Sequence, residues 1–315
     1  MKKIFSVFTS LVLVSLLIYP CGASDRAIQV AKRRLALVIG NSSYKASPLK
    51  NPVNDARDMA AVLKRLGFAV LLKTDADQKT MERSIRDFGN QLKSGGVGLF
   101  YFSGHGLQVY GRNYLVPVDA KIESPSDVKF EGVDAGRVLG KMQDAGNGLN
   151  IIILDACRDN PFARSFRSSE QGLAKMDAPT GSILAYSTAP GSLAADGSGR
   201  NGLYTSKLLK HMMTPGLLIE RVFKNVRIEV MNESKKRQVP WESSSLTGDF
   251  YFKKVYPLSD KISTQPALAP VKTKEERIQR RKIRVKVKQG YWKKTILGEK
   301  YVPPVYEERW IEIKE

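Results

Sequence analysis

Two short polar segments carry the residue types of nucleophilic catalysis, and each follows an apolar run directly. They are Ser103-Gly104-His105-Gly106 and Asp155-Ala156-Cys157-Arg158. A thiol is a poor nucleophile until it is deprotonated, and a neighbouring imidazole can take its proton and stabilise the thiolate. Acyl transfer also needs donors for a developing oxyanion, and the backbone N–H groups of Gly106 and Cys157 are candidates for that oxyanion hole. We therefore predict that His105 and Cys157 are catalytic.

Structural interpretations of these residues compete with the catalytic one. A free cysteine is often a small buried hydrophobe, but Cys157 stands between Asp155 and Arg158, which are unsuited to a core. His105 has the alternative of a hydrogen-bonded loop histidine. His211 lies in an amphipathic stretch with no polar motif beside it, and we interpret it as structural.

The elements that must position the candidate residues alternate between short β-rich runs and longer helical periods, from Arg34 to about Lys254. This pattern predicts an α/β fold with a mostly parallel central sheet and helices on both faces. Catalytic groups in such sheets gather beyond the carboxyl ends of the strands. Buried strands are predicted at Leu35–Gly40, Ala69–Thr74, Val97–Phe102, Leu149–Leu154 and Ser182–Tyr186, with an edge strand at Asp249–Phe252.

Helical spacing and surface signals fill the connections between these strands. Gly111-Arg112-Asn113 predicts the turn of a hairpin within Tyr110–Val118. Residues Arg158–Pro179 show no period and predict a long surface loop. Helices are predicted over Asn51–Leu66, Gln78–Leu92, Asp134–Gln143, Leu203–Met213 and Leu217–Met231.

Residues 1–24 have the charge, apolar run and small residues of a signal peptide, which predicts an exported protein, periplasmic or secreted. An uncleaved anchor and a lipid on Cys21 are the alternatives. With Cys21 removed, Cys157 would be the one remaining cysteine, and no internal disulfide could form. We expect the catalytic domain over residues 30–256, a linker over 257–275 and a basic β-rich region over 276–315, interpreted as a small β-meander.

The formal net charge is +20, and residues 257–315 hold 15 basic against 8 acidic residues. This balance permits contact of the basic tail with an anionic envelope surface, and nothing in it indicates a specific nucleic acid. A merely solvated basic surface is the alternative.

The paired motifs resemble the caspase and metacaspase family of cysteine peptidases, which has the caspase-hemoglobinase fold. Tyr101–Gly106 is followed by Asp155-Ala156-Cys157, with the cysteine 52 residues after the histidine. The resemblance runs from about Arg34 to Phe252 and includes Leu37–Asn41 and Val53–Ala56. It implies an endopeptidase that acts through an acyl-enzyme and needs no cofactor. Arg158–Pro161 replaces the family's usual His-Ser-Gly, and no acidic cluster with ligand spacing supports a calcium or other metal site.

The resemblance also implies a substrate preference. Caspases carry Gln where this sequence has Asp155, and the aspartate points to the metacaspase side, where it lines a pocket for Arg or Lys. Asp55 and Ser103 match the other pocket positions, while Ser187 and Asp196 match the substrate backbone contact and the pocket wall. Asp55 could instead serve only its helix N-terminus, and Ser103 only a turn.

Two rival functions remain open. One is a non-catalytic module of the same fold that binds peptides, against which the presence of both His105 and Cys157 argues. The other is an envelope-binding protein whose function lies in the basic tail.

Overall fold

The computed structural model describes residues 33–93, 95–156, 172–189 and 199–255, and four strands between residues 279 and 313. Cys157, Asp196, the predicted signal peptide and most of the predicted loop Arg158–Pro179 lie outside the described residues. The chain divides into two compact units, Met1–Tyr256 and Pro257–Glu315. Each unit is described by itself.

The first unit is built on a six-stranded sheet in the order β2-β1-β3-β7-β8-β9. The first five of these strands are parallel to one another, and β9 pairs antiparallel with β8. This confirms the predicted α/β class with a mostly parallel sheet, because near-continuous apolar runs suit strands that are covered on both faces. The strands are β1 (Arg34–Gly40), β2 (Ala69–Thr74), β3 (Val97–Ser103), β7 (Leu149–Asp155), β8 (Ser182–Tyr186) and β9 (Trp241–Ser244).

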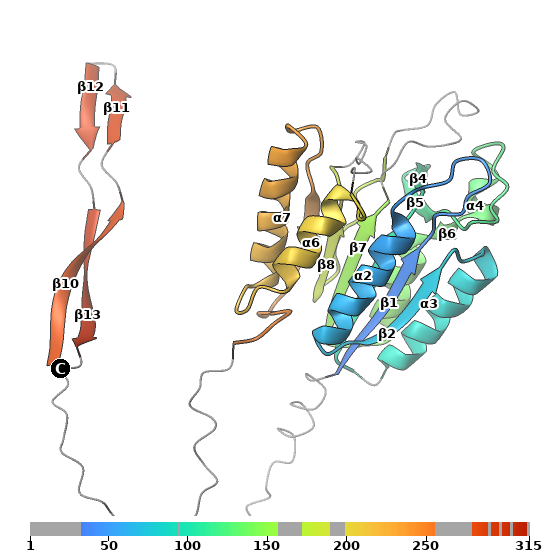
Figure 1. Ribbon diagram of the computed structural model, residues 1–315, viewed down its shortest axis with the longest axis horizontal. Helices are drawn as coiled ribbons and strands as arrows, with labels where there is room; N and C mark the ends of the chain where they lie inside the picture. Colours follow the sequence, from blue (N-terminus) through green and yellow to red (C-terminus); the bar gives the residue numbers. More distant parts are fainter. Residues whose placement is uncertain are drawn as a thin grey trace, which may run out of the picture. The chain divides into compact units, whose positions relative to one another are not determined.

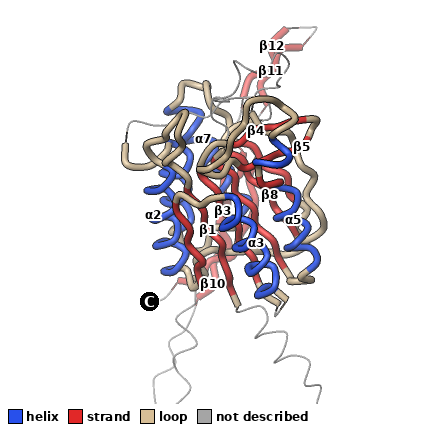
Figure 2. Tube along the Cα trace, turned by 90° about the vertical axis from the view of Figure 1, so that its right-hand side faces the viewer, coloured by secondary structure: helices blue, strands red, loops and turns tan. Residues whose placement is uncertain are grey.

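Helices cover both faces of this sheet (Figure 1, Figure 2). One face packs against α2 (Pro52–Arg65), α6 (Leu203–Met212) and α7 (Ile219–Glu233), and the other packs against α3 (Gln78–Leu92) and α5 (Ala135–Asp144). All five helices were predicted, with ends displaced by at most two residues. No helix among the described residues is long and apolar enough to cross a bilayer.

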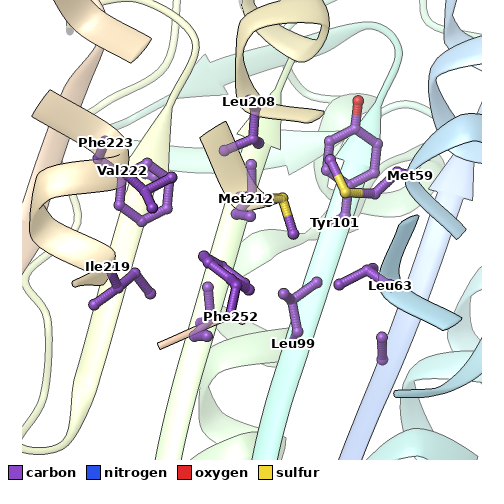
Figure 3. Close-up of a cluster of buried hydrophobic side chains, with 14 of the residues drawn as sticks. Met59, Leu63, Leu99, Tyr101, Leu208, Met212, Ile219, Val222, Phe223 and Phe252 are labelled. Atoms are coloured by element: carbon purple, nitrogen blue, oxygen red, sulfur yellow. The ribbon is translucent and has the colours of Figure 1, made fainter. Parts of the chain in front are cut away.

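Successive side chains of a strand point to opposite faces of the sheet, so odd-numbered and even-numbered residues of β3 pack against different helices. Leu99 and Tyr101 of β3 join the core beside α2, α6 and α7, whereas Phe100 and Phe102 face α3 and α5. Figure 3 shows Tyr101 beside the apolar side chains of the first core, with its hydroxyl oxygen pointing away from Leu99. Because side chains alternate along a strand, the next odd position, Ser103, falls on the α2–α6 side.

A small second sheet, β4-β5-β6, follows β3. Tyr110 and Gly111 join β4 (Gly106–Val109) to β5 (Arg112–Leu115), and both have positive φ, 52° and 73°, as a two-residue I′ turn requires. The predicted hairpin therefore exists, but its turn lies before the expected Gly111–Asn113. The sequence analysis missed α4 (Val128–Glu131) and β6 (Val133–Asp134), which are too short to show a period.

The predicted edge strand at Asp249–Phe252 is wrong. Tyr251 makes only an isolated bridge to Leu218, while Phe250 and Phe252 pack into the first core. The last edge strand is β9, whose sequence Trp-Glu-Ser-Ser lacks the apolar alternation of a strand. An edge strand pairs on one side only and needs no continuous apolar face, which explains the error. The other edge is β2, which was predicted to be buried but is partly exposed, because an edge strand is covered by a neighbouring strand on one side only.

The C-terminal unit is β-rich, as predicted, but it is not a meander. The outer strands β10 (Gln279–Lys288) and β13 (Val305–Ile313) pair with each other, and the inner strands β11 (Tyr291–Thr295) and β12 (Gly298–Val302) form a second antiparallel pair. A meander would pair each strand with the next along the chain. The alternating pattern therefore identified the strands and not their partners.

Candidate active site

The carboxyl ends of β3 and β7 bring two predicted pocket residues side by side. Ser103 and Asp155 are register partners, each the last residue of its strand. Both follow core residues of odd number, Tyr101 and Ile153, that face α2, α6 and α7. Parity therefore places both polar side chains on the same face of the sheet, and both are buried.

Asp55 reaches the same place from the first turn of α2. A Cβ atom on Gly40 would lie only 2.3 Å from the Pro52 carbonyl oxygen, so a glycine at this position lets the helix approach the end of β1. The Asp55 carboxylate is fully buried and accepts hydrogen bonds from Ser103 Oγ at 3.1 Å and from the Gly202 N–H at 2.9 Å. The structure thus brings Asp55, Ser103 and Asp155 together.

The Asp155 carboxylate is held by a residue that the sequence analysis missed. Thr205 Oγ1, in the first turn of α6, donates to Asp155 Oδ2 at 2.7 Å, and Tyr101 OH lies 2.6 Å from the same Thr205 oxygen. A threonine within the buried stripe of an amphipathic helix was the available signal, since a buried hydroxyl needs a partner. Within the described part of the chain, the hydrogen-bond donor to Asp155 is therefore uncharged.

His105 follows β3 in a loop that fixes both its backbone and its ring. Its N–H donates to Tyr44 OH at 3.0 Å, and Tyr44 OH in turn donates to the Val116 carbonyl at 3.0 Å. Ring Nε2 lies 2.8 Å from the Ser47 carbonyl oxygen. A carbonyl oxygen only accepts, so Nε2 carries the proton and Nδ1 is the basic nitrogen of the neutral ring. Tyr44 was not predicted, because its position between two loops is set by tertiary packing.

The ladder between β4 and β5 sets the direction of the Gly106 N–H, which was predicted to donate to an oxyanion. Val116 N–H donates to the His105 carbonyl, so in the alternating antiparallel ladder the neighbouring pair Gly106↔Leu115 is a non-hydrogen-bonded pair. The Gly106 N–H therefore points away from β5. A Cβ atom on Gly106 would lie 2.7 Å from the carbonyl oxygen of Ala156, the residue before Cys157.

Ser187, which was predicted to contact the substrate backbone, and a small cavity lie near the carboxyl ends of the strands. Ser187 follows β8, is fully buried, and accepts a hydrogen bond from Gln238 Nε2 at its carbonyl oxygen, 2.7 Å away. A cavity of about 60 Å³ adjoins His105 between Tyr44 and Val116.

Other titratable groups of the described residues do not extend the site. His211 Nε2 contacts Glu229 of α7 at 3.0 Å, which is the structural role predicted for it. Among the residues that the structure describes, no group of three or more His, Cys, Asp or Glu side chains could hold a metal ion. The described residues therefore place two buried, hydrogen-bonded carboxylates, Asp55 and Asp155, at the sheet edge that is followed by the oriented imidazole of His105.

Comparison with known proteins shows the family of this chain. The caspase domain family, Peptidase_C14, matches residues 33–251. Human mucosa-associated lymphoid tissue lymphoma translocation protein 1 is 35% identical over 131 residues, which are 41% of this chain and 15% of that protein. Mouse caspase-1 is 24% identical over 238 residues, 70% of this chain and 59% of caspase-1. The match thus spans a minor part of the first relative and about three fifths of the second. The family match covers well over half of the chain, and the chain accordingly belongs to the caspase-domain family of cysteine-type peptidases.

Proposed function

We propose that this protein is an exported cysteine endopeptidase that cleaves proteins after Arg or Lys, with Cys157 as nucleophile and His105 as general base. The burial of Asp155 carries the specificity part of the proposal. Asp155 is 3% exposed, and within the described residues the donor to its carboxylate is the neutral Thr205 hydroxyl. No cation contacts this carboxylate among the residues that the structure describes, and a buried carboxylate favours a ligand that supplies a positive charge.

The pocket charge selects against the substrate residue that caspases choose. A substrate carboxylate beside Asp155 and Asp55 would meet like charge in a partly desolvated site, a penalty of several kcal/mol. A guanidinium would gain charge-assisted hydrogen bonds and can make two at once, so Arg is preferred over Lys. The proposed enzyme therefore keeps the cysteine chemistry of the caspase-domain family and departs from the aspartate preference of caspases.

The proposed reaction uses the oriented imidazole twice. Nδ1 of His105 takes the Cys157 thiol proton, and the thiolate attacks the scissile carbonyl carbon, whose oxygen accepts from the N–H groups of Gly106 and Cys157. The imidazolium then gives its proton to the leaving amine as the C–N bond breaks. Water, deprotonated by the same nitrogen, hydrolyses the thioester and restores the thiol. These steps need no cofactor.

Covalent labelling tests this assignment. A peptidyl-arginine acyloxymethyl ketone should add to Cys157, as shown by peptide mass spectrometry, whereas the matched aspartyl ketone should react far more slowly. Cys157→Ala is the control and should take up neither reagent. Equal labelling by both ketones would contradict the pocket assignment, and labelling elsewhere would contradict the nucleophile.

The basic tail supports a second element of the proposal, contact with an anionic envelope surface. Alternate residues of β10 share one face, and four of them are basic. Two of these basic residues are register partners of Trp310 and Tyr306. The other two are register partners of Glu312 and Glu308. Cosedimentation with phosphatidylglycerol vesicles, and not with phosphatidylcholine vesicles, is expected for the whole chain. The residues opposite the two aromatics are Lys282 and Lys286. Replacing both by glutamine should weaken the cosedimentation with phosphatidylglycerol vesicles. Unchanged sedimentation would contradict the proposed contact.

A further inference from the structure

A buried chain of hydroxyl groups ends on the Asp155 carboxylate. Tyr101 of β3, Thr205 of α6 and Asp155 of β7 are 0%, 0% and 3% exposed. The oxygen-to-oxygen distances are 2.6 Å from Tyr101 to Thr205 and 2.7 Å from Thr205 to Asp155 Oδ2. Three elements that are distant in sequence therefore meet in one hydrogen-bonded series.

The direction of this chain follows from the number of hydrogens. A hydroxyl has one hydrogen and an ionised carboxylate only accepts, so the Thr205 hydrogen is committed to Asp155. Tyr101 must then be the donor to Thr205. Burial, together with the charges of Asp55 and Asp155, raises the pKa of Tyr101 well above its ordinary value of 10.0 and keeps this donor protonated. Both O–H dipoles therefore point toward the carboxylate.

The N-terminal end of α6, its N-cap Gly202 and its first turn, contacts both carboxylates. Thr205 holds Asp155, and the N–H of Gly202, three residues earlier, holds Asp55 Oδ1 at 2.9 Å. The positive end of a helix dipole stabilises anions near its first turn. The two carboxylates are thus supported by one helix terminus.

We propose that Thr205, aligned by Tyr101, is a specificity-determining positioning residue. It occupies Oδ2 and fixes the plane of the Asp155 carboxylate, leaving Oδ1 for the cationic side chain of the substrate. This inference rests on the proposed cleavage after Arg or Lys. The orientation is set during folding, so binding a guanidinium needs no ordering of the carboxylate, and a planar ligand benefits more than a point-like ammonium.

Thr205→Val tests the inference because it replaces the hydroxyl by a methyl group of similar shape. Thr205→Ser keeps the donor and is the matched control. The substrates are three peptides that differ only in Arg, Lys or citrulline before the scissile bond, citrulline being neutral and nearly isosteric with Arg. We expect Thr205→Val to lower kcat/KM for the Arg peptide by roughly 10- to 100-fold, mainly through KM, the range for a hydrogen bond to a charged group.

The comparison across substrates separates positioning from general damage. Citrulline cleavage and the rate of Cys157 alkylation by iodoacetamide should stay near wild type, and Thr205→Ser should retain most of the Arg preference. Equal losses for Arg and citrulline, or an unchanged Arg-to-citrulline ratio, would overturn the inference. Should Thr205→Val lose its cooperative thermal transition, Tyr101→Phe decides: a lowered Arg-to-citrulline ratio supports the positioning role and an unchanged ratio overturns it. A wild-type enzyme that does not distinguish Arg from citrulline would instead refute the proposed function.

Discussion

Replacing Asp155 by asparagine removes one charge from the pocket and little else. The asparagine side chain has nearly the same shape, and its amide oxygen can still accept the Thr205 hydroxyl that now lies 2.7 Å from Oδ2. The packing of β7 against α6 is therefore retained. What changes is the electrostatic interaction with a substrate cation.

The expected magnitude follows from the burial of the site. Asp155 is 3% exposed, so water screens it little. Two unit charges about 4 Å apart at an effective dielectric constant of about 20 interact by about 4 kcal/mol. Truncating a buried, hydrogen-bonded charge pair costs about 2 to 5 kcal/mol, which corresponds to a fall of roughly 30- to 5,000-fold in kcat/KM for an Arg peptide.

The assay compares kcat/KM for matched Arg and citrulline peptides. Citrulline carries no charge, so its cleavage should change far less than that of the Arg peptide. Asp87→Asn makes the same chemical change at an exposed position on α3, which covers the other face of the sheet, and should leave both values unchanged. Equal losses for the two peptides in Asp155→Asn would refute the electrostatic reasoning.

Three further predictions concern the nucleophile, self-cleavage and acid stability. Cys157→Ala and His105→Ala should each abolish nearly all peptide hydrolysis and leave the circular dichroism spectrum unchanged. Because the two residues act as one catalytic unit, the double variant should be little less active than either single variant. Substantial activity in either single variant would contradict the dyad. Lys175 is exposed on the loop before β8 and is therefore a candidate site of self-cleavage. Intact-mass spectrometry of the purified wild type should show a new terminus after Lys175 or a neighbouring arginine, and Cys157→Ala should lack it. Identical masses for the two proteins would argue against self-cleavage. The hydrogen bond from the Arg200 side chain holds the pKa of Asp58 below its ordinary 3.8, so the stability from this pair is present above that value and is lost as the pH falls through the lowered pKa. Thermal denaturation should therefore show a smaller loss of stability for Asp58→Asn than for wild type below about pH 4, and parallel curves would contradict this.

The sequence predicted the elements whose local and tertiary requirements agree. Helix α3 has its predicted bounds because Asp77 caps it by accepting from Thr80 N–H, and its apolar residues recur at helical spacing. The five parallel strands were predicted to within one residue because their apolar runs are continuous, and four of them are buried as expected, whereas the edge strand β2 is partly exposed. The placement of Ser103 beside Asp155 followed from the rule that parallel strands end at one edge of a sheet.

The missed features depend on contacts between distant segments. Thr205 is unremarkable within its helix until the sheet brings Asp155 against it, and Tyr44 gains its role from the backbone of His105. Strand β9 has no strand-like pattern and is specified by its pairing with β8. Local periodicity does not encode contacts between distant segments. The sequence therefore predicted Asp155 and His105 as site residues, but it did not predict Thr205 and Tyr44, which orient them.

A cleavage profile on a peptide library tests the central claim most directly. The mature protein is incubated with the library beside Cys157→Ala, and the new termini are identified by mass spectrometry. Cleavage after Arg, then Lys, and none in the variant is the expected result. Cleavage after Asp, or the same cleavage in Cys157→Ala, would contradict the account.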